Sequence, residues 1–234
     1  MIRQRAQNAV RKAVTRFLDY EVKSHRIDGD TIVGRRVEGL ENVSLEGLNH
    51  IGNGVRFAGP ISLGLCTTVH TECLLFGPLT IGRYCQIAPR TMAFPEDHPL
   101  HQITTFTHDT LLGGVMRQYV ECDPIEIESG VWVGAGVTLV RGAAIGNGAV
   151  VGAGSVVTQS IPAYSVAVGS PARVVAMRYP TEIIDIVESS RWWTLGPDEL
   201  ERHRAFFEID LEHATPEDID RLRLLADSLA ESAA

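Results

Sequence analysis

The chain has 234 residues, 44% hydrophobic and 21% charged, an ordinary composition for a globular protein with one sizeable core. Its net charge of −8 argues against a nucleic-acid-binding protein, and no run of about 18 apolar residues predicts a transmembrane helix. The N-terminus lacks the apolar stretch of a secretory signal, and the four cysteines show no CxxC spacing, so we expect a reduced, cytoplasmic protein.

The N-terminal segment, residues 1–30, is expected to hold an amphipathic helix over residues 4–25, where apolar side chains recur at helical spacing. Residues 1–26 carry seven Lys or Arg against two acidic residues, whereas residues 181–234 carry five against fourteen. The two ends of the chain are therefore expected to attract one another. The basic helix either packs on the rest of the fold, which we favour, or docks on an anionic membrane surface.

Bulky aliphatic or aromatic residues recur at every sixth position over two long stretches. The fourteen positions are Leu45, Ile51, Phe57, Leu63, Val69, Leu75, Ile81, Ile87, Ile127, Val133, Leu139, Ile145, Val151 and Val157. Neither a helix nor a simple strand produces a period of six. A chain that turns a corner every six residues does, and hexapeptide periods indicate a parallel β-helix.

A second, smaller residue stands four places after the bulky one, as expected if each side of a prism offers one wide and one narrow inward slot. These residues are Val55, Thr67, Cys73, Cys85, Val137, Ala143, Ala149 and Ser155. Glycine often follows the bulky residue, as at Gly52, Gly64 and Gly134, and we expect these glycines at corners that need a positive φ. The flat faces of a three-sided prism favour a homotrimer.

The repeat predicts a β-helix domain over residues 31–178 that is interrupted by a loop over residues 93–124. The register breaks there, because the interval from Ile87 to Ile127 is not a multiple of six. A long excursion inside a compact domain is usually functional. Residues 179–234 predict a helical extension, in which Thr215-Pro216 is typical of a helix start.

Three of the eight histidines lie in this loop, namely His98, His101 and His108. An imidazole titrates near neutral pH and can accept a proton from a hydroxyl or an amine. From the residues alone, each is either a candidate general base or a solvated surface side chain.

The repeats VGAGVT, LVRGAA, IGNGAV and VGAGSV, the run VVTQSIPAYSVAVGSPARVV and the tail RYPTEIIDIVESSRWWTL resemble the hexapeptide-repeat acyltransferases. Within that family the chain is most similar to the xenobiotic (chloramphenicol and streptogramin) acetyltransferases and related sugar O-acetyltransferases. The resemblance covers roughly residues 45–200. It implies a left-handed β-helix, a homotrimer with active sites between adjacent subunits, and acetyl-CoA as the acyl donor.

By position, the resemblance assigns the general base to His98, which is followed by Pro99 as in sugar-acetylating relatives, with His101 in reserve. Typical xenobiotic members carry an Arg-Met-Asp run after this histidine, where this chain has Pro-Leu-His. The backbone of Gly134 and Ala135 would line the pantetheine arm, and an N–H there could stabilise the thioester oxyanion.

The remaining residues that the resemblance assigns to coenzyme A fall into two groups, and for each small residue plain corner geometry is the alternative role. Along the cofactor these are Ala153, Gly154, Ser155 and Thr158, and at its adenine and 3′-phosphate end they are Gly169, Pro171 and Arg173. Gln159 stands where the family often has Lys, which removes one expected phosphate contact.

The resemblance thus implies acetyl-CoA-dependent O-acetylation of a small-molecule or glycan acceptor, such as a sugar or a hydroxylated antibiotic, by direct attack without a metal. Three alternatives remain. One is N-acetylation of a nucleotide-linked amino sugar. Another is a γ-type carbonic anhydrase with zinc on His70, His98 and His101. The last is a trimeric scaffold without catalysis.

Overall fold

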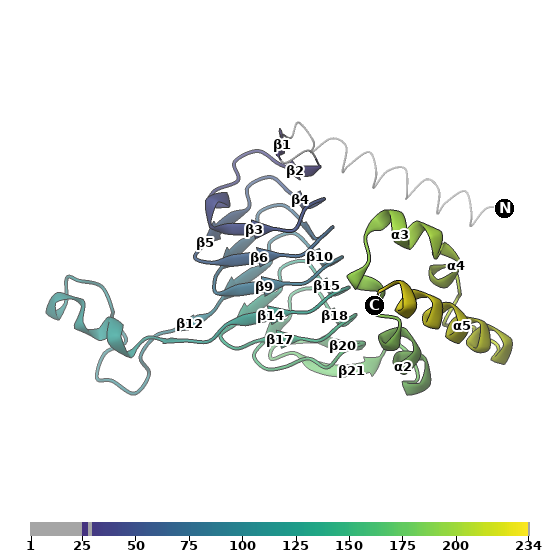
Figure 1. Ribbon diagram of the computed structural model, residues 1–234. Helices are drawn as coiled ribbons and strands as arrows, with labels where there is room; N and C mark the ends of the chain where they lie inside the picture. The colour runs from purple at the N-terminus through teal and green to yellow at the C-terminus, as the bar shows by residue number, and fades with distance from the viewer. Residues whose placement is uncertain (1–24, 28–29, 234) are drawn as a thin grey trace, which may run out of the picture.

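The computed structural model describes residues 25–27 and 30–233, and its main body is a three-sided parallel β-helix (Figure 1). Side A consists of β1 (His25–Ile27), β2 (Thr31–Val33), β4 (His50–Ile51), β7 (Thr68–Val69), β10 (Gln86–Ile87), β15 (Trp132–Val133), β18 (Val150–Val151), β20 (Ser165–Val168) and β21 (Arg173–Met177). Side B consists of β5 (Arg56–Ala58), β8 (Leu74–Phe76), β11 (Met92–Phe94), β16 (Thr138–Val140) and β19 (Val156–Val157). Side C consists of β3 (Val43–Leu45), β6 (Ile61–Leu63), β9 (Leu79–Ile81), β14 (Ile125–Ile127) and β17 (Ala144–Ile145).

Consecutive coils pair in parallel with a shift of three hexapeptides. Ile51 pairs with Val69, and Leu63 pairs with Ile81, each 18 residues further along the chain. Of the fourteen bulky positions, all except Leu45 are buried, and so are all eight small positions. The repeat fold expected from the sequence is therefore confirmed, and its left hand stays a prediction.

The glycines that follow the bulky residues have a different role from the one expected. Gly64 and Gly134 do not adopt positive φ angles. A Cβ on Gly64 would lie 2.5 Å from the carbonyl carbon of Gly82, and one on Gly134 would lie 2.6 Å from the nitrogen of Ala153. These glycines are needed because two coils approach closely, and the positive φ falls two residues later, as at Gly136 with 68°.

The excursion leaves the prism after side B. Ile87 pairs with Val133, which lies 46 residues later, so one coil carries a long insertion. Its first strand, β11, still pairs with β8 and β16, so Ala93 and Phe94 belong to the prism and the loop begins two residues later than the register suggests. The loop projects as the short ribbon β12 (Glu96–Asp97) and β13 (Glu121–Cys122), and it carries the 3-10 segment Leu112–Tyr119 (Figure 1).

The C-terminal helices lie on the side of the prism opposite to this loop (Figure 1). They are α2 (Thr181–Ser189), α3 (Pro197–Arg202), α4 (Arg204–Phe207) and α5 (Pro216–Ser232), with 3-10 turns at Leu40–Asn42 in the β-helix and at Trp192–Thr194. Helix α5 starts with the expected cap, because the Thr215 hydroxyl accepts from the Asp218 N–H at 3.2 Å. A second apolar core, which includes Ile183, Phe206 and Leu229, joins these helices.

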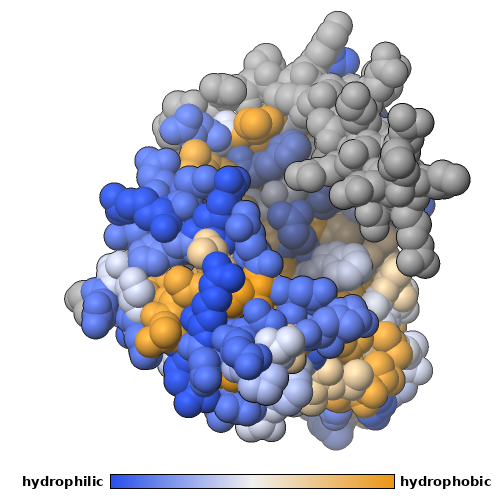
Figure 2. All heavy atoms as spheres, turned by 90° about the vertical axis from the view of Figure 1, so that its right-hand side faces the viewer, coloured by the Kyte–Doolittle hydropathy of each residue, from blue (hydrophilic) through white to orange (hydrophobic). Residues whose placement is uncertain are grey.

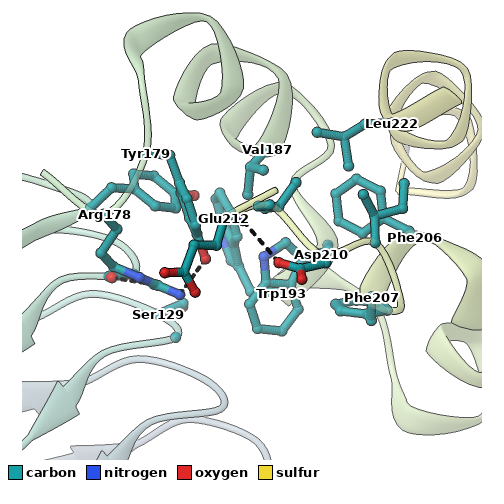
Figure 3. A pocket seen from close by; sticks show the side chains of 16 residues that line it. Ser129, Arg178, Tyr179, Val187, Trp193, Phe206, Phe207, Asp210, Glu212 and Leu222 are labelled. Carbon is teal, nitrogen blue, oxygen red and sulfur yellow. Dashed lines mark hydrogen bonds between the residues drawn. The ribbon is translucent and has the colours of Figure 1, made fainter. Parts of the chain in front are cut away.

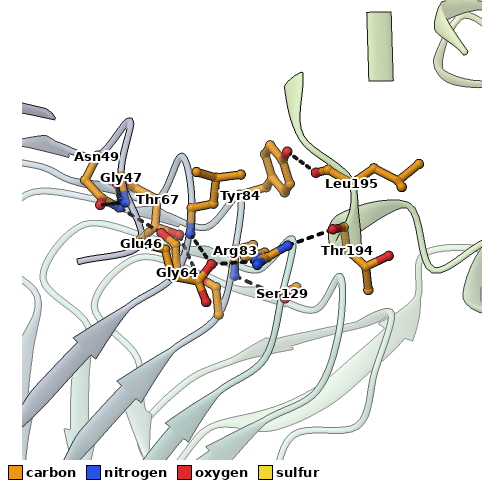
Figure 4. Close-up of polar contacts among 12 residues, drawn as sticks. Glu46, Gly47, Asn49, Gly64, Thr67, Arg83, Tyr84, Ser129, Thr194 and Leu195 are labelled. Atoms are coloured by element: carbon orange, nitrogen blue, oxygen red, sulfur yellow. Dashed lines mark hydrogen bonds and ion pairs between the residues drawn. The ribbon is translucent and has the colours of Figure 1, made fainter. Parts of the chain in front are cut away.

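Two neighbouring side chains of the β-helix hold this extension in place (Figure 4). Arg83 donates from Nη1 to the carbonyl oxygen of Thr194 at 2.7 Å and pairs through Nε with Glu46. The Tyr84 hydroxyl donates to the carbonyl oxygen of Leu195 at 2.5 Å, and burial raises the pKa of Tyr84 to about 12.

The surface over the helical extension is mostly hydrophilic, with patches of hydrophobic side chains (Figure 2). Phe207 and Leu224, for example, are exposed. No helix within the described part of the chain is long and apolar enough to cross a bilayer. The amphipathic helix expected over residues 4–25, and its possible membrane contact, lie outside the described residues, except that His25 begins β1.

Candidate functional site

The loop histidine His98 lies directly after strand β12, where the chain leaves the ribbon. Its Nδ1 atom is 2.7 Å from the carbonyl oxygen of Thr105. A carbonyl oxygen only accepts hydrogen bonds, so Nδ1 carries the proton and the neutral ring keeps its lone pair on Nε2. This tautomer is the one that a general base acting through Nε2 requires.

A cavity of about 380 Å³ opens beside His98 at the base of the loop. Its walls are largely apolar, with Phe76 and Phe94 packed at a centroid distance of 5.4 Å. Polar groups enter it from Glu96, Asp97 and His98. A mostly apolar hollow with a few convergent polar groups is the usual form of a small-molecule site. The sequence pointed to His98 here but not to the two phenylalanines, which ended coil strands without any distinguishing pattern.

The other loop histidines are placed elsewhere. His101 lines a separate hollow of about 280 Å³ together with Tyr119 and Glu121. His108 contacts the hydroxyl of Thr110 at 3.3 Å and lines none of these hollows. Only His98 of the three combines a fixed tautomer with the larger cavity.

One arginine ties the root of the loop to the prism. Arg141, which follows β16 at the next coil, donates from Nε to Asp97 at 2.8 Å, from Nη1 to Asp123 at 2.6 Å, and pairs through Nη2 with Glu121 at 2.9 Å. The hydrogen bond with Asp97, followed by the charges of the other carboxylates, raises the pKa of Arg141. Sequence reasoning missed this residue, although its 18-residue distance from Asp123 is the spacing of one full coil.

The residues assigned to the donor lie at another corner. Gly134 is buried, and its N–H donates to the carbonyl oxygen of Val151 at 2.8 Å, so this N–H is not free for an oxyanion. Ala135 is exposed, and among the described residues its N–H has no hydrogen-bond partner. Of the two expected donors, Ala135 is therefore the one that fits. Its carbonyl oxygen accepts from the Gly154 N–H at 2.9 Å, which stacks Gly154 and Ala153 on the same corner.

Further residues of the donor group follow the same edge of the prism. The Ser155 hydroxyl, which is buried, accepts from the Gly169 N–H at 3.0 Å and so joins two of the expected residues. Thr158 and Pro171 are exposed, as is Arg173 on the edge strand β21. The Arg173 Nη1 atom donates to the carbonyl oxygen of Ala172 at 2.8 Å.

The base and the donor group are not brought together within one copy of the chain. His98 follows side B, at the corner where the chain continues toward side C, whereas Ala135 and Gly154 lie at the corner between sides A and B. None of the donor-side residues lines the cavity beside His98.

A second cavity, of about 470 Å³, lies between the prism and the helical extension (Figure 3). Its lining is rich in aromatic side chains, and Arg178 stacks on Tyr179 with its guanidinium carbon 4.9 Å from the ring centroid. Nearby, the Tyr164 hydroxyl donates to Glu188 at 2.7 Å, and burial, followed by this bond, raises the pKa of Tyr164. No residue from the His98 cavity or the donor group lines this hollow.

The three histidines of the carbonic anhydrase alternative do not converge. His70 follows strand β7 on side A, whereas His98 and His101 lie on the loop in separate hollows. Within the part of the chain that the structure describes, no group of three or more His, Cys, Asp or Glu side chains could hold a metal ion.

Comparisons with known proteins agree with this architecture. Residues 124–159 match the family model described as bacterial transferase hexapeptide (six repeats). The chain is 30% identical over 130 residues to a probable macrolide acetyltransferase of Lysinibacillus sphaericus, which covers 52% of this chain and 72% of that protein.

Among solved structures, a mutant of AntD, an N-acyltransferase from Bacillus cereus in complex with dTDP and coenzyme A, is similar with a TM-score of 0.59 and 19% identity. The similarity covers 70% of this chain and 89% of AntD. A hexapeptide-repeat-containing acetyltransferase from Vibrio cholerae is 26% identical, with a TM-score of 0.41 over 63% of this chain and 76% of that one.

Proposed function

The chain belongs to the hexapeptide-repeat acyltransferases, and from that premise we propose that it transfers an acetyl group from acetyl-CoA to a hydroxyl of a sugar, a glycan or a hydroxylated antibiotic. The observation that carries the proposal is the pair formed by His98 and its cavity: an imidazole with Nε2 available, beside a mostly apolar hollow of about 380 Å³. The probable macrolide acetyltransferase of Lysinibacillus sphaericus supports an antibiotic as acceptor.

The corner between sides A and B fits an extended donor such as coenzyme A. Within the described part of the chain, a Cβ on Gly136 or on Gly154 would meet nothing within 4 Å, so the edge of the prism is open there. Further along, the exposed guanidinium of Arg173 offers a planar cation suited to a phosphate. AntD, which shares the fold, is described in complex with coenzyme A.

The proposed acetyl transfer needs an activated donor, a general base and a hydrogen-bond donor for the acyl oxygen. Acetyl-CoA supplies an activated acyl group when it is bound. His98 Nε2 accepts the proton of the acceptor hydroxyl as its oxygen forms a bond to the acyl carbon, and the imidazolium returns the proton to the departing thiolate. The Ala135 N–H, which has no hydrogen-bond partner among the described residues, stabilises negative charge on the acyl oxygen. Alignment of the two substrates supplies much of the remaining acceleration.

A complete site on this account needs a second copy of the chain, because His98 and Ala135 lie at different corners of one prism. We therefore include a homotrimer in the proposal, since three prisms with flat sides form a closed ring in which each cleft joins two different corners. The loop supports this arrangement, because it exposes large apolar side chains such as Leu100, Ile103 and Leu112.

N-acetylation of an amino sugar is the second candidate. Its support is the fold likeness to AntD, an N-acyltransferase, and the same base would serve an amine acceptor. The two are separated by following free thiol from acetyl-CoA with matched acceptors: a macrolide, a neutral hexose, an amino hexose and a nucleotide-linked amino sugar. Turnover with hydroxyl acceptors alone supports the proposal, and thiol release only with amines replaces it by the second candidate.

A further inference from the structure

Among the described residues, Arg141 pairs with three carboxylates, whereas Arg56 and Arg90 at other corners of the prism each pair with one. These two form the ordinary contact between successive coils: Arg56 pairs with Glu38 at 2.9 Å, and Arg90 pairs with Glu72 at 3.0 Å. Each of these pairs spans 18 residues, and the Arg141–Asp123 pair has the same spacing. Arg141 adds two further carboxylates, and both come from the loop.

The surroundings of Arg141 also differ from those of the ordinary pairs. Its side chain is 28% exposed, compared with 63% for Arg56 and 77% for Arg90. Water screens an exposed pair more than a partly buried one, so the same contact holds more firmly at Arg141. The guanidinium uses its fork of donors on three separate oxygens, which a lysine ammonium cannot match in geometry.

The three carboxylates belong to both legs of the loop. Asp97 lies on the outgoing strand β12, Glu121 lies on the returning strand β13, and Asp123 comes just before the chain re-enters the prism at β14. The ribbon itself contains only two residue pairs, Glu96 with Cys122 and Asp97 with Glu121. A two-stranded ribbon of this size is marginal by itself. Arg141 therefore holds the two legs of the loop together more firmly than the backbone pairing does.

His98 is the residue next to Asp97, so the position of its backbone follows from this tie. On its other side, the ring is held by the carbonyl oxygen of Thr105 at 2.7 Å. We propose that Arg141 is a positioning residue for acyl transfer, which sets the place of His98 by clamping both legs of the loop to the prism. This inference rests on the proposed function and deepens it, because it names what aligns the base.

Loss of the guanidinium has a specific consequence. Without it, Asp97, Glu121 and Asp123 converge with no cation among them, and their mutual repulsion separates the two legs. His98 then moves with Asp97, and a displacement of about 1 Å at a reacting group costs up to roughly 100-fold in rate. Binding of acetyl-CoA, assigned to a different corner, should be unaffected.

The test compares Arg141→Gln with Arg141→Lys and with Arg56→Gln as the matched control from an ordinary coil pair, several coils away from Ala135. We expect Arg141→Gln to lower kcat roughly 10- to 100-fold with an unchanged KM for acetyl-CoA, and Arg141→Lys to recover only part of this loss. Arg56→Gln should keep wild-type values. Amide hydrogen exchange in residues 96–122 should accelerate in Arg141→Gln and not in Arg56→Gln.

A double variant, Arg141→Gln with Glu121→Gln, distinguishes clamping from a general loss of folding. It removes one of the repelling charges, so its kcat should lie above that of Arg141→Gln alone. An Arg141→Gln enzyme with wild-type kcat and unchanged exchange in the loop would overturn the inference and leave the proposed function standing. Wild-type protein that releases no thiol with any acceptor would instead overturn the proposed function and, with it, this role of Arg141.

Discussion

The Nδ1 atom of His98 donates to the carbonyl oxygen of Thr105, seven positions further along the chain, and Nε2 is therefore the ring atom that can accept a proton. Replacement of His98 by Ala removes that acceptor, and we expect kcat to fall by roughly 100-fold or more, the usual scale for a lost general base. Initial rates of thiol release measure the effect. His101→Ala is the control and should stay near the wild-type rate, because His101 lines a different hollow. A large loss in His101→Ala and none in His98→Ala would transfer the role.

The close approach of successive coils predicts which glycines are indispensable. In Gly64→Ala the new methyl group would lie 2.5 Å from the backbone of Gly82, and because backbone yields little, we expect the free energy of unfolding to fall by about 1–3 kcal/mol or more. Urea unfolding midpoints measure this change. Gly196→Ala is the control, since a Cβ there meets nothing of the described residues within 4 Å and φ is −81°. Gly196 is the N-cap of α3, so only the poorer capping by alanine remains, which costs about 0.5–1 kcal/mol. Equal effects at the two sites would contradict the packing argument.

The two buried thiols predict weaker folding at alkaline pH. Burial raises the pKa of Cys73 and of Cys85 from 9.0 to about 11. The unfolded chain therefore loses these protons first as the pH rises, so their contribution is complete below about pH 9 and is lost as the pH rises toward about 11. Unfolding midpoints at about pH 8 and pH 10.5 measure the loss.

The double variant Cys73→Ala with Cys85→Ala is the reference for this prediction. Its smaller side chains lower stability at both pH values, so the informative quantity is the difference between the two pH values within each protein. That difference should be smaller in the variant than in the wild type. Tyr84, whose pKa burial raises to about 12, adds a decline that both proteins share.

The hydrogen bond that anchors the helical extension predicts how much the Tyr84 hydroxyl contributes to stability. Tyr84→Phe leaves the carbonyl oxygen of the buried Leu195 without its donor, which costs about 1–3 kcal/mol of unfolding free energy. Thermal unfolding monitored by calorimetry checks this value. The matched change Tyr179→Phe removes a hydroxyl that accepts from the exposed side chain of Arg178, and a smaller loss is expected there.

Much of the fold follows from the sequence because its rule is local. Each coil repeats the same inward slots, so residues such as Ile51 and Val133 are identified as core from spacing alone. The positive φ expected at Gly64 was wrong. Gly64 is needed because the next coil, 18 residues away, approaches it closely, and the sequence pattern by itself does not distinguish such a glycine from one at a corner with positive φ. The site was predictable only in part. His98 was identified because it lies in the loop that interrupts the repeat. Phe76 lines the same cavity and Arg141 pairs with the neighbouring Asp97 through contacts between coils, which the sequence does not reveal.

Contacts between residues far apart in the sequence could not be predicted from any sequence pattern. Arg83 and Tyr84 bind Thr194 and Leu195 over 111 residues, and neither pair belongs to a repeat. The choice between Gly134 and Ala135 as oxyanion donor likewise depends on a contact between coils, because the Gly134 N–H donates to the carbonyl oxygen of Val151.

On the proposed mechanism, the imidazole from one copy of the chain serves a donor held along the corner of another copy. Complementation tests it: His98→Ala, which lacks the base, is mixed with Ala153→Trp, which fills the open donor edge, by refolding the two chains together. When equal amounts of the two chains assemble at random, about a quarter of all clefts join an intact base to an intact edge, so we predict about a quarter of the wild-type rate of thiol release. No recovered activity in trimers shown to contain both chains would contradict this arrangement.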